Sequence, residues 1–268
     1  MFDDIKLRSL SALILASVSF LILYLGGFYL KIFLSLVLII LNFEWMRIVS
    51  QNKWIIRGII SILFSTLVFF NDGFISMDLV LITSSILIIS SLSSFFNIPS
   101  FWSSFGFIYI LVSLSVIQWI RDMESGLMAL FLIISTIIIS DISGYFFGKT
   151  ISGPKVFKKL SPNKTYSGFF SSLIFGSLWF SLILLFISDK PFLFNLAIGL
   201  LIVSFSIIGD LLLSFLKRKT NLKDSGNILP GHGGMFDRAD SILAVFFLLL
   251  PLLILFGYLD NPLGIIVG

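Results

Sequence analysis

Long, unbroken apolar runs constrain this chain more than any other feature. Nine such runs follow one another with short polar stretches between them. A helix of about 20 apolar residues crosses the roughly 30 Å hydrocarbon core of a bilayer. Only 12% of the residues are charged, whereas soluble domains carry about 25%, and the mean hydropathy is +1.09. We therefore expect an all-α, polytopic helical membrane protein with about nine transmembrane helices, forming a single integral membrane domain over residues 1–268. The predicted spans are 9–25, 29–46, 54–71, 74–94, 101–120, 125–147, 167–187, 192–214 and 239–258.

The basic residues predict how these spans are oriented. With the N-terminus in the cytoplasm, fifteen of the eighteen Lys and Arg residues fall in cytoplasmic loops, and Lys31, Arg121 and Lys190 fall outside. Such a bias is the usual mark of cytoplasmic loops. It accounts for the net charge of +4 without nucleic acid as a partner. We expect a protein of the bacterial inner (plasma) membrane, with its lipid-facing surface in the bilayer and its polar loops in the cytoplasm.

One dense polar run, residues 209–241, interrupts the apolar sequence between two predicted spans. In a chain that is otherwise apolar, a charged loop tethered between two helices is where chemistry is expected. The run predicts a metal-assisted site that handles phosphates at a membrane face. It contains Asp210, Asp224, Asp237, Asp240, Lys217, Arg218, Lys219, Lys223, Arg238 and the single histidine of the chain, His232.

The span 192–214 ends in a polar face. Asp210, Ser214 and Lys217 lie on one side if the helix continues. An acid near the end of a span needs a counter-charge or a water-filled cavity. A bound cation would supply that charge, and neutralisation by Lys217 is the structural alternative.

Three further acids could supply oxygen ligands to a divalent cation. Asp237 and Asp240 are three residues apart and share a helix face, and Asp224 precedes them. Capping of the helix N-terminus is the structural alternative for this pair. Carboxylates suit Mg²⁺ that is bound alongside substrate phosphates.

The stretch from Pro230 to Gly234 is rich in glycine. Successive backbone N–H groups of such a stretch can point into one concavity and hold an oxyanion. We expect Gly231, Gly233 and Gly234 to approach phosphates, although a plain turn is also compatible with the pattern. The sequence leaves open whether His232 is a packing residue or contacts the substrate.

A second polar stretch begins inside the span 125–147. An acid within a span, here Asp141, is a functional-site hypothesis by default. Lys164 and Thr165 follow a Ser-Pro turn and could reach a phosphate. Glu44, beside Trp45, is interpreted as a surface acid next to an aromatic anchor at the bilayer interface.

Together these polar positions resemble the signature of the phosphatidate cytidylyltransferases, also called CDP-diacylglycerol synthases. The resemblance is detailed from Asp141 to Ser241, predicted to be the catalytic C-terminal half (141–241), and elsewhere extends only to apolar spans. The positions that carry it are Ser214-x-x-Lys217-Arg218, Lys223-Asp224-Ser225-Gly226, Pro230-Gly231-His232-Gly233-Gly234-x-x-Asp237-Arg238-x-Asp240, Gly209-Asp210, Asp141-x-x-Gly-Tyr-Phe-x-Gly and Ser161-Pro-x-Lys164-Thr165. Leu213 and Ser167 stand where acids are expected, and Ala239 is smaller than usual, which puts the number of cation-binding carboxylates in doubt.

The resemblance implies transfer of the cytidylyl group of CTP to phosphatidic acid, giving CDP-diacylglycerol and pyrophosphate, with Mg²⁺ and room for a second cation. It implies catalytic roles for Asp210, Lys217, Arg218, Lys223, Asp224, His232, Asp237 and Arg238. It implies substrate binding by Ser214, Lys164, Thr165, Ser225, Gly231, Gly233 and Gly234, and metal binding by Asp210, Asp224, Asp237, Asp141 and Asp240. Alanine at Asp224 or Asp237 is expected to abolish turnover without preventing folding.

Two other functions stay open. A cytidylyltransferase or kinase acting on another lipid phosphate or lipid alcohol would use the same head-group chemistry. An ion-coupled transporter would use Asp141 and Asp210 as pathway acids, although polarity gathered at one face argues against transport. The sequence does not decide whether the protein acts as a homodimer.

Overall fold

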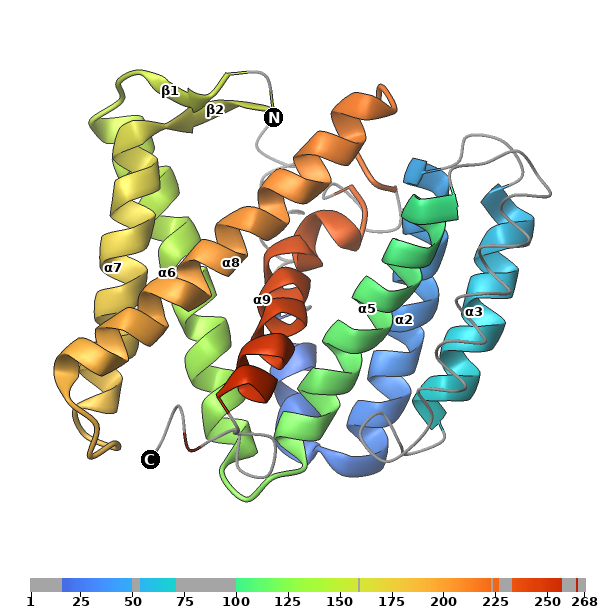
Figure 1. The fold of residues 1–268 in the computed structure, drawn as a ribbon, viewed down its shortest axis with the longest axis horizontal. Coiled ribbons are helices and arrows are strands. Elements are labelled where there is room, and N and C mark those ends of the chain that lie inside the picture. Colours follow the sequence, from blue (N-terminus) through green and yellow to red (C-terminus); the bar gives the residue numbers. More distant parts are fainter. Residues whose placement is uncertain are drawn as a thin grey trace. The chain divides into compact units, whose positions relative to one another are not determined.

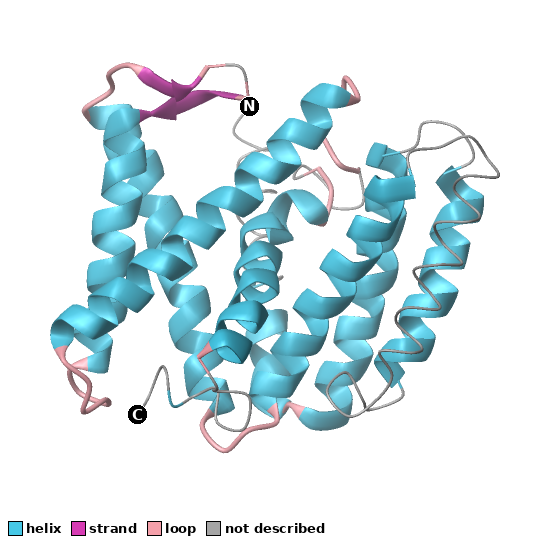
Figure 2. Cartoon of the chain, in the orientation of Figure 1, coloured by secondary structure: helices cyan, strands magenta, loops and turns pink. Residues whose placement is uncertain are grey.

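The computed structural model describes residues 16–49, 54–70, 100–158, 160–222, 224–226, 233–256 and 264. Nearly all of them are helical (Figures 1 and 2). The helices are α2 (Gly27–Val49), α3 (Trp54–Phe70), α5 (Ser100–Arg121), α6 (Gly126–Thr150), α7 (Tyr166–Leu184), α8 (Phe192–Lys219) and α9 (Phe236–Leu255), and the strands are β1 (Lys155–Phe157) and β2 (Ser161–Thr165). A short helix, Ala16–Leu25, precedes them.

The helical membrane fold predicted from the apolar runs is confirmed. Within the described ranges, α2, α5, α6, α7, α8 and α9 are long and apolar enough to cross a membrane, whereas α3 and Ala16–Leu25 are shorter apolar helices. The chain is a polytopic helical membrane protein. The predicted span 74–94 lies outside the described residues, so the count of nine spans stays a prediction, as does the single membrane domain.

Two boundaries and one element differ from the sequence-based expectation. Helix α8 continues to Lys219 rather than ending at 214, and α9 begins at Phe236. The polar stretch between α6 and α7 contains an antiparallel hairpin in which Lys155 pairs with Thr165 and Phe157 with Ser161. Strands of three and five residues, one of them almost wholly polar, lack the alternation that would have predicted a strand.

The chain divides into two compact units, and the described residues of the first lie within 1–118 and 216–239. Its core is aromatic: the Trp45 ring lies 5.4 Å from that of Phe236 and 6.0 Å from that of Tyr109. The Trp45 indole N–H donates to the carbonyl of Trp102 at 2.8 Å. Gly106 is required beside this ring, because a Cβ there would overlap the indole. These contacts join α2, α5 and the start of α9.

The second unit comprises 119–215 and 240–268. In Figure 1, α6 and α7 lie side by side with the hairpin at one end of the pair. Small residues line this helix pair, and serine hydroxyls bond across it: Ser172 donates to the carbonyl of Ser140 at 2.9 Å, and Ser171 to that of Ser143 at 3.2 Å. Small residues and interhelical hydrogen bonds are the usual means of helix association in a bilayer. The pairing of α6 with α7 fixes the position of Asp141 along the helix axis relative to the hairpin.

Candidate functional site

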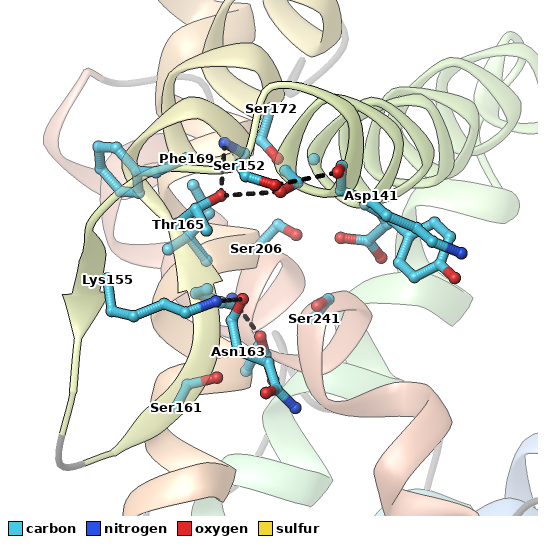
Figure 3. Close-up of a pocket in the computed structure, with 18 residues that line it drawn as sticks. Asp141, Ser152, Lys155, Ser161, Asn163, Thr165, Phe169, Ser172, Ser206 and Ser241 are labelled. Carbon is cyan, nitrogen blue, oxygen red and sulfur yellow. Dashed lines mark hydrogen bonds and ion pairs between the residues drawn. The ribbon is translucent and has the colours of Figure 1, made fainter.

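A cavity of about 620 Å³ opens in the second unit (Figure 3). Residues from α6, the hairpin, α7, α8 and α9 line it. Figure 3 shows the side chains of Asp141 and Ser206 directed into this space. The lining residues with charged or polar side chains include Asp141, Lys149, Ser152, Lys155, Ser161, Asn163, Lys164, Thr165, Ser172, Ser206, Asp210 and Ser241. The cavity therefore unites the acids predicted at 141 and 210 with the second polar stretch.

Three charges meet in the cavity. Lys164, at the end of β2, forms an ion pair with Asp210 of α8. Asp141 of α6 experiences the charges of both Lys164 and Asp210. Lys149 and Lys155 also line the cavity, so its lining carries two carboxylates and three ammonium groups. The counter-charge that Asp210 needs is thus supplied by Lys164.

The local structure explains why Lys164 reaches this place. Thr165 follows it and caps α7, accepting a hydrogen bond from the Gly168 N–H at 3.2 Å. A Cβ on Gly148 would lie 3.1 Å from the Thr165 hydroxyl oxygen and 3.4 Å from the Cα of Gly168. Gly148 of α6 therefore lets the start of α7 approach closely. Thr165 is buried, and its hydroxyl serves this cap.

The cavity fits a hydrated divalent cation. Mg²⁺ is usually held by one or two carboxylates together with waters and substrate phosphates, and Asp141 and Asp210 are such a pair. The Ser206 hydroxyl is buried, lines the cavity and has no hydrogen-bond partner among the described residues. A buried hydroxyl without a partner is costly, so its position indicates that a polar species completes the cavity.

The second cluster of predicted residues lies in the first unit and centres on Asp237. Its Oδ1 accepts from the Lys217 ammonium at 2.7 Å. Its Oδ2 accepts from the N–H of Ser225 at 2.9 Å, the hydroxyl of Ser225 at 2.9 Å and the N–H of Gly234 at 3.2 Å. A carboxylate offers about four lone-pair positions. In this arrangement Asp237 organises the loop, and so does Ser225, which is fully buried.

Glu44 corrects the interpretation made from the sequence. It is not a surface acid: its exposed fraction is 3%. Its carboxylate accepts from the N–H groups of Met235 at 2.9 Å and Phe236 at 2.7 Å, and from the Ser225 hydroxyl at 3.1 Å. Glu44 thus caps α9 from α2. The sequence signal was a lone acid inside an apolar run, but its partners lie more than 180 residues away.

In the described part of the glycine stretch, protein carboxylates accept the hydrogen bonds of the backbone N–H groups. The N–H groups of Gly234, Met235 and Phe236 donate to Asp237 and Glu44 rather than facing an open space. Gly233 has a positive φ of 82°. A Cβ on Gly234 would lie 2.6 Å from the Gly226 nitrogen. The Gly234 N–H donates to a protein carboxylate, and the approach of the glycines to phosphates stays a prediction.

A family model described as Cytidylyltransferase family matches residues 6–256. The chain belongs to this family. Among curated proteins, it is 39% identical over 140 residues to the phosphatidate cytidylyltransferase of Bacillus subtilis, covering 52% of each chain. It is 36% identical over 147 residues to that of Rickettsia typhi, covering 52% of this chain and 64% of the relative. The match to the phosphatidate cytidylyltransferase of Brucella melitensis is 26% identical and covers 98% of both chains. The first two matches thus span about half to two thirds of those relatives.

The remaining residues of the cytidylyltransferase signature are placed as follows. Asp224 is exposed and lies beside Gly233. The Asp240 carboxylate accepts from the N–H of Ser241 at 2.8 Å. Ser214 is half-buried on α8, and Arg218 and Arg238 are exposed. Lys223, Gly231 and His232 lie outside the described residues.

Four of the acids predicted as cation ligands in this cytidylyltransferase-family chain lie in two pairs. Asp141 and Asp210 line one cavity, and Asp224 and Asp237 flank Gly233. No group of three or more acidic or histidine side chains suited to a metal occurs in the described ranges. A cation held by all five predicted carboxylates therefore stays a prediction. Asp141 and Asp210 are the pair that opens onto a cavity.

Proposed function

We propose that the protein transfers the cytidylyl group of CTP to phosphatidic acid and releases CDP-diacylglycerol and pyrophosphate. The observation that carries this proposal is the cavity of Asp141, Lys164 and Asp210, at the ends of apolar helices in a chain of the Cytidylyltransferase family. Relatives that bear the name phosphatidate cytidylyltransferase, including one aligned over 98% of the chain, support it.

The reaction needs positive charge more than it needs a protein nucleophile. An oxygen of the lipid phosphate forms a bond to the α-phosphorus of CTP, and the bond to the β-phosphate bridging oxygen breaks, so that pyrophosphate leaves with the electron pair. Both reactants are anions, and they repel each other in a cavity of low dielectric. Lys164 supplies a fixed positive charge there, and Lys149 and Lys155 also line the cavity. Fixed charges of this kind stabilise charge that develops during phosphoryl or nucleotidyl transfer.

Asp141 and Asp210 are the residues that would hold Mg²⁺, which when bound neutralises part of the phosphate charge. Asp210 is also ion-paired with Lys164. Substrate phosphates would therefore compete with Asp210 for the Lys164 ammonium. The carboxylates of Asp224, Asp237 and Asp240 are the remaining candidates for a second cation. The family resemblance adds two roles to the proposal. His232 would orient a phosphate, and the substrate phosphates would be held by the basic groups of Lys217, Arg218, Lys223 and Arg238.

The proposed setting is the inner membrane of a bacterium, with the N-terminus and the active site facing the cytoplasm. The chain contains no cysteine, so single cysteines can report the side of each loop. Ile151 is 67% exposed and Phe186 is 89% exposed, at opposite ends of the α6–α7 pair. An impermeant maleimide should label Phe186→Cys in intact cells and Ile151→Cys only after permeabilisation. The reverse pattern would invert the orientation.

The function is tested with the purified full-length chain in mixed micelles. CTP and phosphatidic acid with Mg²⁺ should give CDP-diacylglycerol and pyrophosphate in equal amounts, as measured by mass spectrometry. Parallel reactions with polyprenyl phosphate, and with diacylglycerol plus CTP, test another lipid phosphate and lipid kinase activity. Product in either of those alone would replace the proposed substrate. Ion flux into liposomes without any CDP-lipid would indicate a transporter.

A further inference from the structure

A second hollow, of about 730 Å³, lies against the hairpin in the second unit. Its walls combine apolar and basic side chains. The residues that matter to the argument are Lys155, Phe157, Lys158, Leu160, Tyr166 and Phe215. None of the residues that line it is acidic.

The hollow lies where lipid head groups would be. The hairpin connects α6 to α7, and both helices are long and apolar enough to cross a bilayer, so their connection lies at the membrane surface. Tyr166, the first residue of α7, is 46% exposed. Tyrosine is typical of this interfacial level. A ligand bound in the hollow would therefore lie at the depth of the phospholipid head groups.

The chemistry of the hollow favours a phosphate attached to apolar chains. Lys155 and Lys158 are exposed. The Lys155 ammonium donates to the carbonyl of Asn163 at 3.3 Å, a neutral acceptor, and an ammonium has three donors in all. The ammonium groups together with the rings of Phe157 and Tyr166 match an anionic lipid. A water-soluble anion would gain nothing from the apolar wall.

Lys155 also connects the hollow to the reaction. This residue lines the hollow and, in addition, the cavity that contains Asp141 and Asp210. In Figure 3 its side chain extends across the hairpin toward Asn163. A phosphate held at Lys155 therefore borders both spaces. The hollow is placed to deliver a lipid phosphate to the charged cavity.

We propose that the hollow beside the hairpin binds the lipid substrate, with its phosphate monoester at Lys155 and Lys158 and the upper part of its acyl chains against Phe157, Leu160 and Tyr166. This inference rests on the proposed cytidylyl transfer and specifies how the lipid, as distinct from the nucleotide, is held. It makes Lys158 and Phe157 determinants of lipid affinity that lie outside the catalytic cavity.

The experiment compares Lys158→Gln and Phe157→Ser with the unchanged chain in mixed micelles. Loss of one charge-assisted contact or one apolar wall should raise the KM for phosphatidic acid about five- to tenfold, with the KM for CTP and kcat unchanged. The matched control is Lys190→Gln, in the loop at the opposite end of α7, which should leave all three constants unchanged. Size-exclusion profiles identical to that of the unchanged chain verify folding.

A photoreactive phosphatidic acid should crosslink to the segment 154–166, and Lys158→Gln should reduce the yield. A photoreactive phosphatidylcholine with the same chains, a phosphodiester, should crosslink weakly. Inorganic phosphate separates a lipid site from a general anion site: if it abolishes crosslinking at concentrations that leave the lipid KM unchanged, the hollow binds free phosphate and the inference fails. An unchanged lipid KM in both variants, in a chain that makes CDP-diacylglycerol, would overturn the inference and leave the proposed function intact. If the unchanged chain makes no CDP-lipid, the proposed function itself fails.

Discussion

Replacement of Glu44 by alanine should destabilise the protein strongly, although Glu44 lies far from the glycine turn in sequence. The carboxylate is 3% exposed and accepts three hydrogen bonds, from the N–H groups of Met235 and Phe236 and from the Ser225 hydroxyl. In Glu44→Ala the N–H groups of Met235 and Phe236 lose their acceptor, whereas the Ser225 hydroxyl keeps Asp237 as a partner. Gly226 and Gly234 pack against the same carboxylate, since a Cβ on either would lie within 3 Å of its oxygens. The truncation therefore also leaves an empty space.

The magnitude follows from the number and kind of these bonds. A hydrogen bond to a charged group contributes roughly 1.5–3 kcal/mol. The three bonds of Glu44 therefore set an upper limit on the loss in the free energy of unfolding, and relaxation of the loop makes the actual loss smaller. Each buried backbone N–H that is left without an acceptor costs about 1–3 kcal/mol, so with the lost packing we expect a total loss of roughly 3–5 kcal/mol. Glu44→Gln should cost roughly half as much, because the amide NH₂ replaces one acceptor oxygen and leaves a single backbone N–H without a partner.

The assay is the thermal unfolding of the detergent-solubilised full chain, followed by fluorescence-detected size exclusion. A loss of about 3–5 kcal/mol should lower Tm by roughly 6–20 °C at about 2–4 °C per kcal/mol. Glu124→Ala is the matched control, because Glu124 is an exposed acid in the turn between α5 and α6, and its Tm should not change. Limited proteolysis should show faster cleavage within 220–236 in Glu44→Ala.

A Tm within 2 °C of the unchanged chain, with unchanged cleavage of the loop, would refute the reasoning. That result would mean that Glu44 does not hold the start of α9. A lowered Tm with equal effects of alanine and glutamine would show that packing, rather than the three hydrogen bonds, carries the stabilisation.

Three further outcomes are expected. Asp141→Asn and Asp210→Asn should each lower kcat about 100-fold or more, with Tm nearly unchanged because both side chains line an open cavity; normal turnover in both would remove this cavity from the mechanism. Asp237→Asn should lower both turnover and Tm, since it weakens the bond to Lys217 and replaces one acceptor oxygen with an NH₂ group. Asp224→Asn, at an exposed position, should leave Tm unchanged. Equal Tm values in the two variants would argue against the loop-organising role of Asp237. Removal of divalent cations with EDTA should abolish CDP-lipid formation and added Mg²⁺ should restore it, and full activity in EDTA would exclude the proposed Mg²⁺ site at Asp141 and Asp210.

The sequence determined the features that depend on local composition. The lengths of the apolar runs predicted α2, α5, α6, α7, α8 and α9 within a few residues, because a bilayer-spanning helix needs only length and hydrophobicity. Charged residues are costly within a membrane, so the positions of Asp141, Asp210 and the loop 209–241 already indicated where a site should lie. The resemblance to the phosphatidate cytidylyltransferases rested on the same positions.

Only the tertiary structure decided which of these residues meet. Lys164, not Lys217, is the partner of Asp210, and Lys217 pairs with Asp237 instead. Glu44 reaches Ser225 across 181 residues of sequence, and no periodicity or spacing reports a contact over that separation. The short hairpin was likewise not predicted, because strands of three and five residues are too short to show a period-2 pattern. Local pattern thus fixed the helices and the polar segments, whereas the pairing of buried charges depended on how the helices pack.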